Sequence, residues 1–161
     1  MRKSVPSTNS NRIVIGIGNL YRSDDAAGLL VVNSLRKDNP AGIKFVENAG
    51  DGFSLLHQWS KGDQVVLVDA VLSDAPAGTV RRFDLLTESL SDKALHFSTH
   101  TFSLPEAIQL ARQLQLFPSE MLLFTIDGKN FDNGTQVSPE VTIAVAHVAE
   151  TISKTLGAGS L

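Results

Sequence analysis

The feature that most constrains the fold is a regular alternation, from Arg12 onward, of short apolar runs with stretches of helical periodicity. The runs are apolar throughout, which is typical of parallel strands covered by helices on both sides of a sheet. The pattern predicts an α/β fold with three α/β/α layers around a twisted, mostly parallel five-stranded sheet. We expect strands at residues 12–18, 43–47, 64–71, 79–85 and 121–126, the fourth of them at an edge, and helices at 24–38, 53–60, 103–115 and 138–157.

The chain has 161 residues, of which 42% are hydrophobic, and this predicts a single domain at 12–157 after a flexible tail at 1–11. The net charge is −3 and the basic residues are scattered, which argues against a nucleic-acid partner. No run approaches the ~20 apolar residues of a membrane span, and the tail lacks the apolar stretch of a signal peptide. We therefore expect a cytoplasmic protein without a membrane partner. Cysteine is absent, which excludes disulfides, thiolate metal sites and a cysteine nucleophile.

Acidic residues and a histidine follow the expected strands. Asp24 and Asp25 follow the first strand, Asp69 lies at the end of the third, and His100 lies in the loop after the fourth. In open parallel sheets ligands bind beyond the carboxyl ends of the strands, where the strand order reverses, so we expect one shared crevice. Asp69 stands out because it ends the apolar run VVLV, where an ionised carboxylate needs a partner. The plain alternatives are a favourable helix-dipole position for Asp24 and Asp25 and a solvent-exposed loop position for His100.

Two carboxylates and an imidazole form an oxygen-rich site that suits a divalent ion such as zinc, manganese or nickel. Without a metal, two facing aspartates could share a proton and activate water, as in acid proteases. Both chemistries predict a hydrolase. The competing interpretation is a nucleotide-binding turn at Gly16 and Gly18, but Tyr21 replaces the third glycine of that motif, and carboxylates at the helix N-terminus would compete with a phosphate.

Four sequence blocks, taken in order, resemble the hydrogenase maturation endopeptidases, which process the large subunit of nickel-iron hydrogenases. The blocks are GIGNLYRSDDAAG, VDAVLSDAPAG, FSTHTFSLPEAI and FTIDGKNFDNGTQVSPEV. The resemblance implies a twisted, mostly parallel sheet between helices and removal of a short C-terminal extension from the nickel-loaded large-subunit precursor. It also implies that Asp25, Asp69 and His100 bind the metal, with Asp25 and Asp69 as the catalytic carboxylates and the precursor as the source of the nickel. Asp24 would then cap or position the helix that follows it.

The glycine-rich loop at 47–52 is expected to line the substrate groove, because Gly50 and Gly52 permit close approach of the backbone. Asp51, between them, has no assigned role. Two rival functions remain open: a metal-dependent chaperone that binds the precursor without cutting it, and a Rossmann-like nucleotide-binding domain. The mass of the precursor after incubation separates the first from a peptidase, and a titration with NAD or ATP tests the second.

Overall fold

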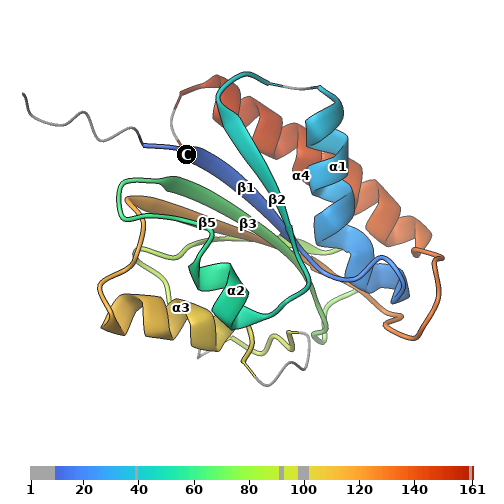
Figure 1. The fold of residues 1–161 in the computed structure, drawn as a ribbon. Coiled ribbons are helices and arrows are strands. Elements are labelled where there is room, and N and C mark those ends of the chain that lie inside the picture. Colours follow the sequence, from blue (N-terminus) through green and yellow to red (C-terminus); the bar gives the residue numbers. More distant parts are fainter. Residues whose placement is uncertain (1–9, 39, 91–92, 98–101, 160) are drawn as a thin grey trace, which may run out of the picture.

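A five-stranded sheet with the order β2-β1-β3-β5-β4 forms the centre of the computed structural model of this chain (Figure 1). The structure describes residues 10–38, 40–90, 93–97, 102–159 and 161, so the expected tail lies almost entirely outside the described residues and stays a prediction. The strands are β1 (Arg12–Ile17), β2 (Ile43–Asn48), β3 (Gln64–Val71), β4 (Val80–Asp84) and β5 (Glu120–Asp127). The helices are α1 (Ala27–Lys37), α2 (Gly52–Leu56), α3 (Leu104–Gln113) and α4 (Pro139–Gly157), and a 3-10 turn, η1 (Ser23–Ala26), precedes α1.

The sheet is mostly parallel, as predicted. β1 pairs in parallel with β2 and with β3, and β3 pairs in parallel with β5. β4 is the exception, because it lies at the edge and runs antiparallel to β5. It therefore begins at the edge of the sheet where the other strands end.

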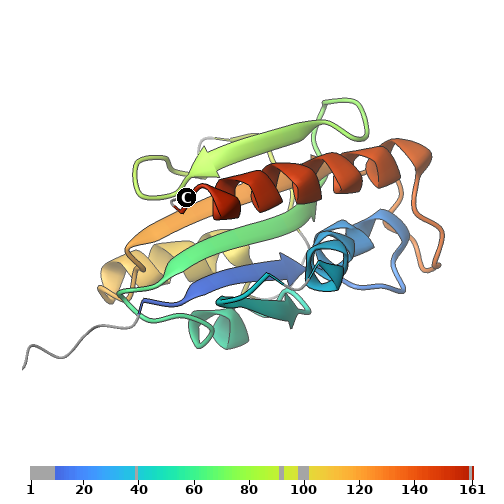
Figure 2. The same ribbon diagram turned by 90° about the horizontal axis from the view of Figure 1, so that it is seen from above.

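Helices cover both faces of the sheet, with α1 and α4 on one side and α2 and α3 on the other (Figures 1 and 2). Successive side chains of a strand point to opposite faces. On β3, Val66 and Val68 therefore pack in the core beneath α1 and α4, whereas Val65 and Leu67 pack in the core beneath α2 and α3. This double burial explains the all-apolar strands and confirms the three-layer α/β/α architecture. Within the described part of the chain, no helix has both the length and the apolarity needed to cross a bilayer.

The strand order reverses between β1 and β3. From β1 the chain passes through α1 to β2 on one side and then through α2 to β3 on the other side. The carboxyl ends of β1 and β3 are neighbours in the sheet, since Gly16 pairs with Val68. This is the position at which open α/β sheets place their ligands.

Candidate active site

Glycines let the chain after β1 pack closely against the sheet. Gly18 has φ +149°, and a Cβ there would lie 1.9 Å from the backbone oxygen of Asp25. Gly28, in the first turn of α1, would place a Cβ 2.3 Å from the backbone oxygen of Val68 on β3. A Cβ at Gly16 would lie equally close, 2.3 Å, to the oxygen of Gly28. Protein backbone rather than open space thus lies beside this turn, which argues against the nucleotide-binding interpretation.

Asp25 and Asp69 are almost fully buried, with exposed fractions of 3% and 1%. Asp25 lies in η1, which packs against β3, and Asp69 lies near the end of β3. Burial, and after it the negative charge of Asp25, raises the pKa of Asp69 well above its usual value, while a hydrogen bond from the backbone of Ala70 acts in the opposite direction. The two predicted carboxylates are therefore close enough for one charge to act on the other.

The carboxylate of Asp69 keeps one oxygen available. Its Oδ1 atom is buried and accepts no hydrogen bond from any residue that the structure describes. A cavity of about 10 Å³ adjoins this side chain on the face covered by α2 and α3, which is about the volume that one water molecule needs. The cavity is lined by Ile17, Gly50, Leu55, Asp69, Phe97 and Leu104.

The capping role expected for Asp24 is wrong, because its side chain makes no cap hydrogen bond to η1 or α1, whereas the alternative role of positioning the helix stays a prediction. Its side chain is fully buried and points instead to the loop after β5. The carboxylate accepts hydrogen bonds from the backbone N–H groups of Lys129 at 2.9 Å and Asn130 at 3.0 Å. It also accepts from the backbone N–H of Ser138 at 2.7 Å and from its hydroxyl at 2.8 Å. Asp24 therefore holds the start of α4, because the loop folds back over η1 and supplies donors from a distant part of the sequence.

His100 lies outside the described residues, so its predicted place in the site stays a prediction. Of the nearest described residues on either side of it, one lines the cavity beside Asp69 and the other contacts the start of α2. Phe97 lines the cavity beside Asp69, and the backbone oxygen of Phe102 accepts a hydrogen bond from the N–H of Gly52 at 2.9 Å. Within the described ranges, no group of three His, Cys, Asp or Glu side chains is arranged to hold a metal ion. A metal site of the predicted kind therefore needs a further donor, from His100 or from the substrate.

The two glycines in the loop after β2 let its backbone lie close to neighbouring groups, as predicted. Gly50 has φ +92° and lines the cavity beside Asp69, and a Cβ at Gly52 would lie 2.5 Å from the ring of Phe102. Asp51 has a role that the sequence reasoning missed. Its carboxylate accepts hydrogen bonds from the N–H groups of Phe53 at 3.2 Å and Ser54 at 3.1 Å, so it is the N-cap of α2. Aspartate is favoured at helix N-caps, and this preference could have predicted the role of Asp51 from the sequence.

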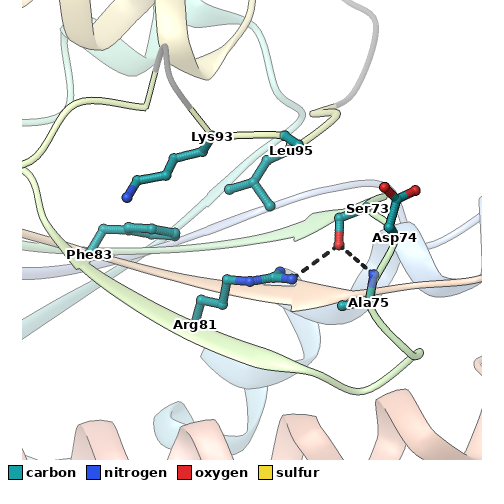
Figure 3. A pocket seen from close by; sticks show the side chains of 8 residues that line it. Ser73, Asp74, Ala75, Arg81, Phe83, Lys93 and Leu95 are labelled. Carbon is teal, nitrogen blue, oxygen red and sulfur yellow. Dashed lines mark hydrogen bonds between the residues drawn. The ribbon is translucent and has the colours of Figure 1, made fainter.

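A second buried carboxylate ends an apolar strand and was also missed. Asp127 is the last residue of β5 and has no exposed surface. Unlike Oδ1 of Asp69, which has no hydrogen-bond partner among the described residues, the Asp127 carboxylate is paired: Arg81 of β4 forms an ion pair with it and Ser73 donates a hydrogen bond to it. Figure 3 shows Arg81 reaching Ser73, to which it donates at 3.2 Å. The two residues border an open pocket of about 400 Å³, lined by Ser73, Asp74, Ala75, Arg81, Phe83, Lys93, Ala94 and Leu95.

The mostly parallel, doubly covered sheet makes this an α/β protein of the open-sheet class, and its switch point carries a buried aspartate pair. A family model described as hydrogenase maturation protease matches residues 29–155. The match covers well over half of the chain, and the chain belongs to the hydrogenase maturation protease family. This confirms the family and the class of protein, a peptidase, that the sequence blocks predicted. It leaves the Rossmann-like alternative without support.

Relatives and solved structures agree with this assignment. The chain is 28% identical over 134 residues to the hydrogenase expression/formation protein HupD of Thiocapsa roseopersicina, an alignment that covers 80% of this chain and spans only 60% of that relative. The structure of the NiFe hydrogenase maturation protease HybD from Thermococcus kodakarensis is similar, with a TM-score of 0.72, 26% identity and coverage of 89% of this chain and 97% of that one. The hydrogenase maturating endopeptidase HybD from E. coli shares the fold, with a TM-score of 0.73, 20% identity and coverage of 92% and 94%.

Proposed function

We propose that this protein is an endopeptidase that removes a C-terminal extension from the nickel-loaded large-subunit precursor of a nickel-iron hydrogenase, in the cytoplasm. The observation that carries the proposal is the buried pair of Asp25 and Asp69 at the switch point between β1 and β3. The family assignment supports the class of reaction and the kind of substrate.

The donor atoms suit a divalent ion that arrives with the substrate. The buried Oδ1 of Asp69 accepts no hydrogen bond from the described residues, and an oxygen in this state is an available ligand. Asp25 supplies a second carboxylate nearby, and we propose His100 as the nitrogen donor. Two oxygens and one nitrogen without a thiolate make a modest nickel site, so the free protein should bind the ion weakly. The nickel of the precursor would complete the set, and binding it would orient the scissile peptide bond beside the aspartates.

A second mechanism of cleavage uses the aspartate pair alone. The pKa of Asp69 is raised by its burial and then by the charge of Asp25. A carboxyl group in this position can hold a proton at a pH where an exposed aspartate is ionised. Such a pair could accept a proton from an attacking water and return it to the leaving amine, as in aspartic peptidases.

Cleavage assays on purified precursor, with and without nickel, test the proposal. We expect a mass loss equal to the extension only for nickel-loaded precursor, and almost none with Asp25→Asn, Asp69→Asn or His100→Ala. His147→Ala is the matched control, because His147 lies on an exposed part of α4 and should leave cleavage unchanged. Equal cleavage of both precursor forms would instead support the aspartate pair acting without nickel. Binding of the precursor without any change in its mass would show a chaperone and overturn the proposed peptidase.

A further inference from the structure

Thr125 on β5 carries a buried hydroxyl with no evident structural purpose. The residue has no exposed surface, and its Oγ1 atom has no hydrogen-bond partner among the described residues. An unsatisfied buried hydroxyl is unfavourable, and a valine of similar shape would avoid that penalty in a strand. The neighbouring residues of β5, Phe124 and Ile126, are apolar. A hydrogen-bond partner for this hydroxyl would remove the penalty.

The sheet register places Thr125 directly beside Asp69. These residues are paired across β3 and β5, and the pair before them on the same face is Leu67 with Leu123. Both leucines belong to the core beneath α2 and α3, so Asp69 and Thr125 point to that same side of the sheet. Side chains paired in this way on neighbouring strands lie side by side, so one water can bridge two polar atoms that make no direct hydrogen bond.

The two unsatisfied atoms are chemically complementary. Oδ1 of Asp69 can accept a hydrogen bond and Oγ1 of Thr125 can donate one. On the opposite side of Thr125, Arg81 of β4 is its register partner, but the guanidinium of Arg81 is engaged with Asp127 and Ser73. Oδ1 of Asp69 is thus the neighbouring acceptor that lacks a donor within the described part of the chain.

We propose that Thr125 is a positioning residue: its hydroxyl makes no direct bond to Oδ1 of Asp69 in this structure, but one water that accepts from the hydroxyl and donates to Oδ1 would join them and fix the orientation of that carboxylate. The contact between Thr125 and Asp69 is independent of the proposed function; only its importance for catalysis rests on the catalytic role proposed for Asp69. In this arrangement Thr125 on the neighbouring strand β5 fixes the side-chain rotamer of Asp69. The remaining acceptor positions of the Asp69 carboxylate stay available for the substrate.

A double-mutant cycle on the free protein tests the contact without any cleavage assay. Thr125→Val should raise the equilibrium constant for unfolding about ten- to a hundredfold in the wild type, because it removes a donor from a buried carboxylate. In an Asp69→Ala background the same substitution should have no such effect or should stabilise the protein. Thr125→Ser keeps the hydroxyl and should retain the coupling to Asp69, although the loss of a buried methyl group lowers stability in both backgrounds. Thr151→Val is the control, because the Thr151 hydroxyl donates to the backbone oxygen of His147 on α4 and should show no coupling to Asp69.

Equal effects of Thr125→Val in the two backgrounds would overturn the inference. So would a crystal structure with Oγ1 and Oδ1 more than about 3.5 Å apart and no water shared between them. The cleavage assay keeps the two proposals separate. If Thr125 and Asp69 are coupled but nickel-loaded precursor is not cut, the positioning contact stands and the proposed function fails.

Discussion

The carboxylate of Asp24 accepts hydrogen bonds from both the backbone N–H and the hydroxyl of Ser138, at 2.7 and 2.8 Å. Ser138 is the N-cap of α4, and 114 positions separate the two residues in sequence. The contact ties η1, which carries Asp25, to the start of the last helix. Adjacent aspartates therefore have different tasks: Asp24 holds the scaffold, and Asp25 faces the candidate site.

We expect Asp24→Asn to lower the free energy of unfolding by about 2–4 kcal/mol. An asparagine keeps one accepting oxygen but turns an NH₂ group toward backbone donors that the carboxylate now satisfies. Chemical denaturation of the two proteins measures the loss. Asp132→Asn, on an exposed part of the same loop, should change stability by less than about 0.5 kcal/mol. A loss below about 1 kcal/mol for Asp24→Asn would mean that these hydrogen bonds contribute little.

The contribution of Asp24 should also depend on pH in a defined direction. Burial acts to raise the pKa of Asp24, but the hydrogen bonds from Ser138, Lys129 and Asn130 outweigh it and lower the pKa below its usual value. The folded state therefore releases this proton more readily than the unfolded state, and the stabilisation is present above the unfolded pKa of about 4. The stability difference between wild type and Asp24→Asn should be constant near neutral pH and should shrink as the pH falls through the folded pKa. A difference that grows on acidification would contradict this sign.

Local patterns were sufficient to predict the strands, the edge position of β4 and the carboxyl edge that carries Asp25 and Asp69. Such features depend on the periodicity of neighbouring residues and on the geometry of parallel sheets. The task of Asp24 was not predictable in this way, because its donors at Lys129, Asn130 and Ser138 come from a loop more than a hundred positions away.

Asp127 shows the limit of the signal that singled out Asp69. Each of these aspartates ends an apolar run, but Asp127 is satisfied by Arg81 and Ser73, whereas Oδ1 of Asp69 has no partner among the described residues. The difference depends on which strand lies alongside. Arg81 reaches Asp127 because β4 returns antiparallel to β5, and the sequence contains no local sign of that pairing.

Replacing Gly28 should test the close packing that sets η1 against the sheet. In Gly28→Ala the new Cβ would lie 2.3 Å from the oxygen of Val68 and 2.4 Å from that of Ile17, both rigid backbone atoms. We expect a loss of roughly 3 kcal/mol in the free energy of unfolding, because α1 must shift away from β1 and β3. Gly157→Ala is the matched control, since no described atom beyond its chain neighbours and its own helix backbone lies within 4 Å of the added Cβ, and it should be neutral or slightly stabilising. Thermal denaturation of both variants measures the contrast, and equal midpoints would show that α1 can adjust without cost.

Asp69 should show the conflict between stability and function that buried catalytic groups impose. Its burial and the charge of Asp25 raise its pKa, so the folded protein binds this proton more tightly than the unfolded chain does. Between the unfolded pKa of about 4 and the raised folded pKa, stability therefore falls as the pH rises, and above the folded pKa the whole penalty is present. Asp69→Asn removes the ionisable group and with it the penalty.

We expect Asp69→Asn to abolish cleavage of the precursor and yet to raise the free energy of unfolding at neutral pH by roughly 0.5–2 kcal/mol. The gain should shrink as the pH is lowered toward 4, where the wild-type carboxyl is protonated in the folded state. Chelator-treated protein should be used, so that bound metal does not contribute. Asp63→Asn is the contrasting variant: Asp63 is equally buried, with 3% exposed, but it accepts hydrogen bonds from the N–H groups of Asn11 at 2.9 Å and Ser60 at 2.7 Å. It should lose stability at the same pH. If Asp69→Asn is destabilised as much as Asp63→Asn, then Asp69 is a satisfied structural carboxylate, and its assignment to the active site is wrong.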